Sequence, residues 1–359
     1  MLANSFFDRD PERRPSQRWV NRALDGRLQD GYNVGPIRLG PEHRYVIFSD
    51  HHKGARTRAD AFRQCEATYL AALDYYHARG YTLIILGDGE ELLEEPVEKV
   101  MKAYENVLRS EARFHPGCMI RVYGNHDIQW QTAEMARQFL DPFFPGIEFR
   151  QELVFRYDDG EFNSGDIFLI HGYQGTMDSD MLAFMARIVL PYYRNFQIRT
   201  GFGATSPSRD ACLRSLHDNR LYRWASRKSK LMLIAGHTHR PVWSSKTHLD
   251  KLTGELYDLL QLEPEQRSSD YEERVLKLKH EIEERQAKFP PCMDIIKTKP
   301  CYFNTGCCQF EDGDITGIEI ENGVIRLIKW GKDGGDTNHG EMLRSILEQN
   351  SLAEIFFYL

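Results

Sequence analysis

Five apolar runs in this chain each end in a short polar motif, and this arrangement limits what the chain can fold into. The runs read as buried strands over 45–48, 83–86, 119–122, 167–170 and 231–235. Helical patterns over 58–79 and 96–113 separate the first three of them. Apolar strands that alternate with helices are typical of a sheet covered by helices. The sequence therefore predicts an α/β fold.

The residues that follow these runs are of the types that bind metal ions in proteins. They are Asp50, His52, Asp88, Asn125, His171, His237 and His239. The carboxyl ends of strands form the edge where α/β proteins bind ligands. Oxygen and imidazole donors without a thiolate suit Mn, Fe, Zn or Ni, and we expect Mn. Seven side chains are too many for one tetrahedral ion, so we predict two divalent ions. The glycines before Asp88, Asn125 and His237 are expected to permit sharp turns.

The order of these motifs resembles that of the calcineurin-like metallophosphoesterase superfamily. The motifs are D-x-H, G-D-x-x-E, G-N-H-D, H-G and G-H-T-H, and the resemblance covers residues 44–330, including Tyr302 to Gly306. It implies a four-layer αββα sandwich with helical insertions. It also implies that Asp50, His52 and His239 hold one ion, that Asp88 bridges both ions, and that Asn125, His171 and His237 complete the set of ligands around the second ion.

The same resemblance implies an activity, the hydrolysis of a phosphate ester or anhydride by in-line attack of a metal-bridging hydroxide. His126 corresponds to the histidine that contacts the phosphate and can protonate the leaving oxygen. Asp127 is expected to hydrogen-bond to His126 and orient its ring. Glu91 is expected to support the turn at Asp88.

Three functions stay open at this point. The first is a phosphoesterase that acts on a small phosphorylated substrate, which could be a nucleotide. The second is a pyrophosphatase or phosphodiesterase acting on a nucleotide- or lipid-linked substrate, and the third is a non-catalytic metal-binding scaffold. The layout is similar to that of bacterial UDP-diacylglucosamine pyrophosphatases, but these typically have Arg where this chain has His126, which argues against carrying over their substrate.

We expect one catalytic core with additions rather than several domains. The parts are an N-terminal arm over 1–43, a metallophosphoesterase domain over 44–335, and a C-terminal helix over 336–359. The core contains a helical cap over 177–230 and an acidic helical insert over 243–299. The cap carries ten Lys and Arg against four Asp and Glu. Because guanidinium groups bind phosphate well, its candidate substrate-binding residues are Arg187, Arg194, Arg199, Arg220 and Arg223.

Charge and composition exclude several other classes. The net charge of −7 argues against a protein that coats duplex nucleic acid, and no nucleic-acid-binding module is recognisable. The chain shows no secretory leader and no apolar run long enough to cross a bilayer. Its seven cysteines are scattered and show no C-x-x-C pair. We therefore expect a cytoplasmic protein with reduced thiols, and its oligomeric state stays open.

Overall fold

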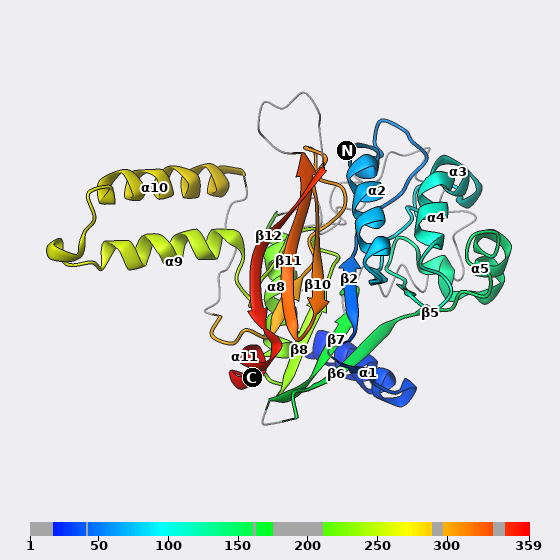
Figure 1. Cartoon of the computed structure of the whole chain (residues 1–359), viewed down its shortest axis with the longest axis horizontal. Coiled ribbons are helices and arrows are strands. Elements are labelled where there is room, and N and C mark those ends of the chain that lie inside the picture. The colour runs from blue at the N-terminus through cyan, green and yellow to red at the C-terminus, as the bar shows by residue number, and fades with distance from the viewer. Residues whose placement is uncertain (1–16, 41, 161–162, 175–210, 289–296, 333–341) are drawn as a thin grey trace, which may run out of the picture.

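The computed structural model of the chain describes residues 17–40, 42–160, 163–174, 211–288, 297–332 and 342–359. Two β-sheets pack face to face in it, and helices cover the outer face of each sheet (Figure 1). The predicted αββα sandwich is therefore confirmed.

The larger sheet has seven strands in the order β12-β11-β10-β2-β3-β4-β5. Strands β2 to β5 run parallel to one another, and β10 to β12 are antiparallel neighbours. Their bounds are β2 (Arg44–Phe48), β3 (Thr82–Leu86), β4 (Met119–Val122), β5 (Phe149–Arg150), β10 (Ile315–Glu321), β11 (Val324–Lys332) and β12 (Met342–Ser351).

The smaller sheet has five strands in the order β1-β6-β7-β8-β9. Strands β7, β8 and β9 run parallel, while β6 and β7 are antiparallel. Their bounds are β1 (Ile37–Leu39), β6 (Glu152–Asp158), β7 (Ser164–Ile170), β8 (Leu231–Ala235) and β9 (Tyr302–Asn304). In both sheets the parallel strands bring their carboxyl ends to a common edge.

Alternating side chains of the central strands explain why each run is apolar throughout. Ile47 of β2 and Ile84 of β3 face the core between the two sheets. Their neighbours Val46 and Ile85 face a second core beneath the helices. A strand that is buried on both faces needs apolar residues at every position, since successive side chains point in opposite directions.

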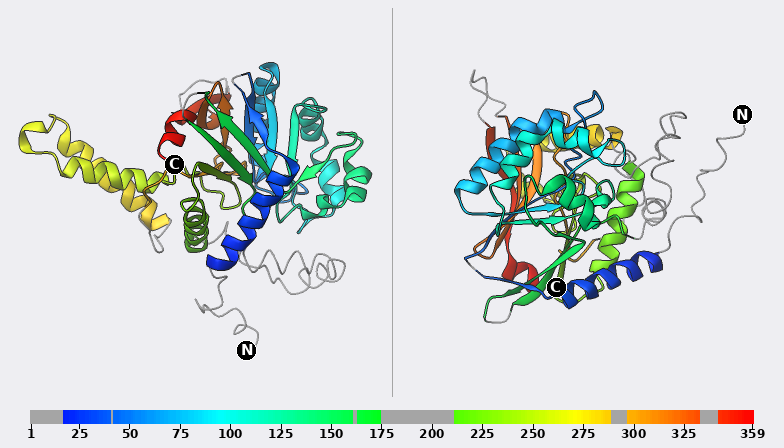
Figure 2. Two further views of the ribbon diagram at one scale, coloured as in Figure 1. Left: turned by 90° about the horizontal axis from the view of Figure 1, so that it is seen from below. Right: turned by 90° about the vertical axis from the view of Figure 1, so that its right-hand side faces the viewer.

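Two pairs of helices form the outer layers (Figure 2). Helices α2 (Phe62–Ala78) and α4 (Glu105–Ala112) pack on the seven-stranded sheet. Helices α1 (Gln17–Val34) and α8 (Ala211–Ala225) pack on the five-stranded sheet. The helices α3 (Val97–Ala103), η2 (Ile128–Gln131) and α5 (Ala133–Leu140) pack together in a smaller cluster beside β5.

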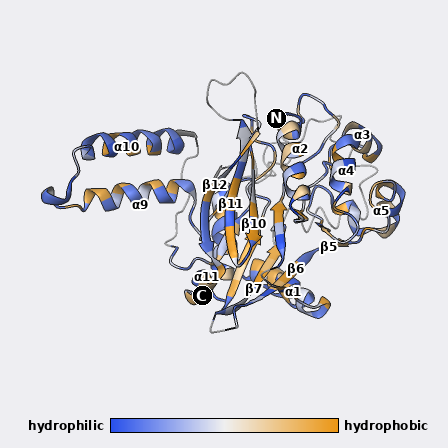
Figure 3. Ribbon diagram, viewed as in Figure 1, coloured by the Kyte–Doolittle hydropathy of each residue, from blue (hydrophilic) through white to orange (hydrophobic). Residues whose placement is uncertain are grey.

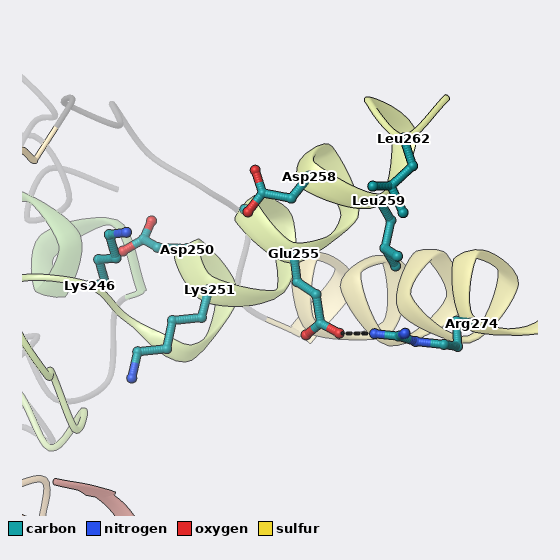
Figure 4. Close-up of a pocket in the computed structure, with 9 residues that line it drawn as sticks. Lys246, Asp250, Lys251, Glu255, Asp258, Leu259, Leu262 and Arg274 are labelled. Carbon is teal, nitrogen blue, oxygen red and sulfur yellow. Dashed lines mark hydrogen bonds and ion pairs between the residues drawn. The ribbon is translucent and has the colours of Figure 1, made fainter. Parts of the chain in front are cut away.

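The acidic insert contains a helical hairpin that projects from the sandwich (Figures 1 and 3). It consists of α9 (His248–Leu260), the short helix η3 (Pro264–Gln266) and α10 (Tyr271–Lys288), and α9 begins at a capping box between Thr247 and Asp250. Val275, Leu278 and Ile282 of α10 pack against α9. A groove that runs along the hairpin is lined by residues of both charges, including the Glu255–Arg274 ion pair (Figure 4).

The prediction of a C-terminal helix is wrong over most of its length. Residues 342–351 form β12, and only α11 (Leu352–Phe357) is helical. The apolar residues Leu343, Ile346 and Leu347 had a helix-like spacing, but they are 42%, 45% and 45% exposed. Pairing with β11 along the whole strand overrides that local pattern.

The expected N-terminal arm also differs from the structure where it is described. Helix α1 buries Val20, Leu24 and Leu28 in the core of the five-stranded sheet, and β1 is a strand of that sheet. Both elements therefore belong to the sandwich. In the cap, residues 177–210 lie outside the described residues, and α8 is the described part.

Candidate metal centre

Two adjacent loops of the seven-stranded sheet carry the first candidate ligands. Asp50 and His52 follow β2, and Asp88 follows the parallel strand β3. The Asp50 amide donates to the Gly87 carbonyl at 3.1 Å, and the His52 amide donates to the Asp88 carbonyl at 2.9 Å. Asn125 follows β4, which is parallel to β3. These loops are thus fixed beside one another.

The five-stranded sheet supplies the three remaining candidates. His171 follows β7, and His237 and His239 follow the parallel strand β8. The Gly236 amide donates to the His171 carbonyl at 2.9 Å, and the His237 amide donates to Asp50 Oδ2 at 2.9 Å. Strand ends from both sheets therefore meet at one place.

Five candidate ligands have a left-handed backbone conformation, which residues other than glycine rarely adopt. Ten described non-glycine residues have φ angles between 48° and 68°, and half of them are Asp50, His52, Asp88, His237 and His239. Left-handed backbone is uncommon outside glycine, and it persists only where the surrounding structure holds it. The strain is concentrated at the proposed site.

One group of ligand atoms consists of Asp50, His52 and His239. His239 Nε2 lies 3.1 Å from Asp50 Oδ1 and 3.2 Å from His52 Nε2. His52 Nε2 lies 3.9 Å from Asp50 Oδ1. Three donors thus surround one point, as the sequence predicted for the first ion.

A second group consists of Asp88, His171 and His237. His171 Nε2 lies 3.0 Å from Asp88 Oδ2, and the same oxygen lies 3.6 Å from His52 Nε2 in the first group. Asp88 therefore faces both groups. The His237 Nε2 and Asn125 Oδ1 atoms are buried and have no hydrogen-bond partner.

These residues fit a pair of divalent ions. Bonds of roughly 2.0–2.2 Å to a metal place neighbouring donors about 3–4 Å apart, as they are here. A buried polar atom without a partner is costly, and a bound ion would satisfy both His237 Nε2 and Asn125 Oδ1. The surrounding imidazoles also hold the pKa of the Asp50 carboxyl well below its usual range, although burial acts in the opposite direction.

Comparison with known families decides where this centre belongs. The model of the calcineurin-like phosphoesterases matches residues 43–241, more than half of the chain, and this stretch contains all seven candidate ligands. The chain belongs to this family. No curated protein matches its sequence. Among solved structures, it is similar to vacuolar protein sorting 29 from Cryptosporidium parvum, with 13% identity, a TM-score of 0.33, and coverage of 86% of this chain and 98% of that one.

In this chain, Glu91 links a candidate ligand to the candidate acid. Its carboxylate oxygens lie 2.8 Å from His52 Nδ1 and 2.8 Å from His126 Nδ1. The side chains of His52, His126 and His239 are 11%, 17% and 13% exposed, whereas those of Asp50 and His171 are fully buried. The three histidines therefore mark the side of the centre that a substrate can reach.

The expected role of Asp127 needs correction. Its carboxylate accepts from the Gly89 amide at 2.8 Å and from the Gly124 amide at 2.6 Å, and the partner of His126 Nδ1 is Glu91. Burial, Asp88 and Glu90 raise the pKa of Asp127 to about 7. Asp127 thus joins the loops after β3 and β4, and Glu91 orients the His126 ring.

The expected reason for the glycines is also incomplete. Of the three glycines that precede Asp88, Asn125 and His237, only Gly87 has a left-handed φ, of 85°. At Gly124, a Cβ atom would overlap the Asp88 carboxylate, and at Gly236 it would overlap Ser49 and Asp50. A Cβ atom at Gly87 would likewise overlap the His171 ring, so all three glycines are required for space beside the ligands.

The arginines expected to bind substrate are only partly visible. Arg187, Arg194 and Arg199 lie outside the described residues. Arg220 lies on α8 close enough to His217 to lower the pKa of that imidazole, whose burial has the larger effect in the same direction. Arg223 is exposed in the last turn of α8. A role for any of them in binding substrate stays a prediction.

Several supporting residues carried no motif that could have indicated them. The side-chain amide nitrogen of Gln309 lies 2.8 Å from His239 Nδ1. Lys53 and Arg121 are fully buried beside Glu90. Glu90 stands at a position that the G-D-x-x-E motif leaves unspecified. His51, next to the candidate ligand His52, is fully buried against Tyr69.

We expect Glu91→Gln to lower Mn²⁺ affinity or activity by about 10–100-fold, a typical effect of losing the partner of a ligating histidine. The variant removes the negative charge that holds His52 and His126 together. Calorimetric Mn²⁺ titration and initial rates measure the two effects. Glu94→Gln, a change at an exposed neighbour, is the control. Equal behaviour of both variants would contradict the role given to Glu91.

Metal binding should also weaken as the pH falls. His171 Nδ1 lies 2.8 Å from the Leu86 carbonyl and donates to it, so Nε2 faces Asp88. Burial lowers the pKa of His171, but the carboxylates of Asp88 and Asp50 outweigh it and raise that pKa to about 9. Near pH 7 an ion must therefore displace a proton from Nε2.

We accordingly expect Mn²⁺ affinity to rise by up to about tenfold per pH unit between pH 6 and 8, because one proton leaves as an ion binds. Calorimetry at pH 7 in two buffers of different ionisation enthalpy counts the released protons. Affinity that is independent of pH, with no proton released, would show that metal binding does not displace a proton from His171.

Proposed function

We propose that this protein is a dinuclear metal-dependent phosphoesterase that hydrolyses a phosphate ester or anhydride. The observation that carries the proposal is the Asp88 carboxylate, whose Oδ2 faces donors of both ligand groups. The donor set is oxygen and imidazole, which suits Mn²⁺, and Fe, Zn or Ni are alternatives. Two bound divalent ions would supply an activated water and would neutralise charge on the phosphoryl group.

The residues of the chain account for binding and proton transfer. Burial lowers the pKa of His126, but the carboxylates of Glu91 and Asp88 outweigh it and raise this pKa above its usual value, which favours the protonated imidazole. Its Nδ1 is held by Glu91, which leaves Nε2–H to donate to a phosphate oxygen or to the leaving oxygen. The His126 amide donates to Asp88 Oδ1 at 2.8 Å and keeps the two residues in register.

The coarse organisation of the protein follows from the same proposal. We propose one catalytic core, within which the cap over 177–230 and the acidic insert over 243–299 are insertions. Positive residues of the cap would contact the anionic substrate. No helix in the described part of the chain is long and apolar enough to cross a membrane. The thiols of Cys65, Cys118, Cys301, Cys307 and Cys308 are free, which supports our proposal of a reducing, cytoplasmic setting.

Removal of metal should abolish the activity. We expect treatment with a chelator to lower hydrolysis of aryl phosphates by at least about a hundredfold, because the ions supply both the nucleophile and charge neutralisation. Added Mn²⁺ should restore the hydrolysis. Protein treated with the chelator and then given Ca²⁺ serves as the control. Full activity of protein shown by mass spectrometry to hold no divalent metal would overturn the proposal.

The same assay separates classes of substrate. A monoaryl phosphate, a bis-aryl phosphate and a panel of nucleoside diphosphates distinguish a monoesterase, a diesterase and a pyrophosphatase. Hydrolysis of none of them by fully loaded protein would favour a non-catalytic scaffold.

A further inference from the structure

Helix α8 lies behind the loops that carry three of the candidate ligands. It packs on the outer face of the five-stranded sheet, next to the ends of β8 and β9. Among its described residues four polar side chains are buried, and the two least exposed of them are adjacent in sequence. These are His217, which is 3% exposed, and Asp218, which is fully buried. A buried carboxylate is costly unless its partners compensate, so its partners indicate what it holds.

Asp218 is bonded to the G-H-T-H loop on both sides of His239. Its Oδ1 accepts from Thr238 Oγ1 at 3.1 Å, and its Oδ2 accepts from Arg240 Nε at 3.1 Å. The Tyr302 hydroxyl donates to Oδ1 at 2.7 Å. Thr238 lies between the candidate ligands His237 and His239, so Asp218 fixes the short segment that sets the direction of both imidazoles.

Asn304 of β9 holds the same loop. Its amide nitrogen donates to the Gly236 carbonyl at 2.6 Å and to Thr238 Oγ1 at 3.2 Å. Both His237 and His239 have left-handed backbone, with φ angles of 68° and 55°. Such a conformation needs support from outside the loop, and Asp218 and Asn304 supply it from two elements.

Helix α8 also contacts the neighbouring ligand loop. His217 Nε2 lies 2.6 Å from the carbonyl of Gly172, the residue after His171. The ring centroid of His217 lies 5.1 Å from that of His237. One turn of α8 therefore holds all three histidines that the five-stranded sheet contributes.

We propose that Asp218 is a positioning residue for metal binding, which acts through Thr238 and Arg240 on His237 and His239. This inference rests on the proposed function, since it takes these histidines as ligands. Substrate and ions would not touch Asp218. Its effect should therefore appear as weaker metal binding that excess metal can overcome.

The test compares Asp218→Asn with a matched change on the same helix. Tyr222→Phe removes the hydroxyl that accepts from the Thr298 amide at 2.9 Å, and this bond does not reach a ligand loop. Each variant is stripped of metal and titrated with Mn²⁺ by calorimetry, its melting temperature is measured, and its kcat is followed against Mn²⁺ concentration. We expect Asp218→Asn to weaken Mn²⁺ binding by about 10–100-fold, with kcat recovered at saturating Mn²⁺.

Tyr222→Phe should lower the melting temperature with Mn²⁺ affinity unchanged within about twofold. If Asp218→Asn behaves in this way too, the residue is only structural and the inference is wrong. If Asp218→Asn does not fold, Thr238→Ala removes the same link from the loop side, and it should weaken Mn²⁺ binding by a similar factor. Unaltered Mn²⁺ binding in Thr238→Ala would also overturn the inference.

The result is distinguishable from a failure of the proposed function. Unmodified protein that binds two Mn²⁺ ions but hydrolyses no phosphate compound would refute the phosphoesterase, while the calorimetric comparison still decides the role of Asp218. Unmodified protein that binds no divalent ion would refute both.

Discussion

The Asp88→Asn variant is expected to lose about a thousandfold or more in kcat. Residues that only support ligands typically contribute 10–100-fold, and Asp88 Oδ2 faces donors of both candidate ion sites, at 3.0 Å and 3.6 Å. An amide carries no charge and cannot neutralise two cations as a shared carboxylate can. The variant should also retain fewer than two ions after purification.

The measurements are kcat on an aryl phosphate at saturating Mn²⁺, metal content by mass spectrometry, and circular dichroism to confirm folding. Asp74→Asn is the control because Asp74 is an exposed carboxylate on α2, paired only with the exposed Arg113 among the interactions described for it. Asp88→Asn with full activity and two bound ions would show that the carboxylate does not join two sites.

The largest loss of stability is expected from Arg121→Met. Arg121 is fully buried on β4 and donates to both oxygens of Glu90, at 2.8 Å and 2.6 Å. Lys53 lies 3.1 Å from Glu90 and 2.7 Å from Glu111, and all four side chains are fully buried. Removing one member of a buried ion pair typically costs about 3–5 kcal/mol, because the remaining charge is left without its partner.

Urea unfolding measures the change in the free energy of unfolding. Arg109→Met is the control, because it removes an exposed ion pair. Arg109 forms an exposed pair with Glu105 on α4, and such pairs contribute about 0–1 kcal/mol. Combining Arg121→Met with Glu90→Gln should recover part of the loss, since the double variant no longer buries the same carboxylate. A change for Arg121→Met as small as that for Arg109→Met would contradict the importance of this network.

The fold was predictable where local pattern and tertiary burial agree. Strands β2, β3 and β8 are buried on both faces, so their sequences are apolar throughout and the next residues lie at the sheet edge. The same reasoning failed at β12. That strand lies at an edge of the sheet with much of its apolar surface exposed, and its identity depends on pairing with β11, which no local pattern reports.

The site was predictable for residues inside motifs and not for those that reach them from elsewhere. Asp50, His52 and His239 converge as expected, since each follows a recognisable strand. The partner of His126 was misassigned because Asp127 is its neighbour in sequence, whereas Glu91 is its neighbour in space. Asp218 and Gln309 reach the ligand loops from separate elements, and a single sequence does not record which turn of α8 packs behind β8.

The candidate ligands come from both sheets, with Asp50, His52, Asp88 and Asn125 on one and His171, His237 and His239 on the other. Bound ions would therefore cross-link the two layers of the sandwich at one edge. An ion that binds only the folded chain adds about 2.7 kcal/mol of stability at one hundred times its dissociation constant. Scarcity of metal would thus shorten the lifetime of the protein as well as slow its reaction, with opening between the sheets starting at this edge.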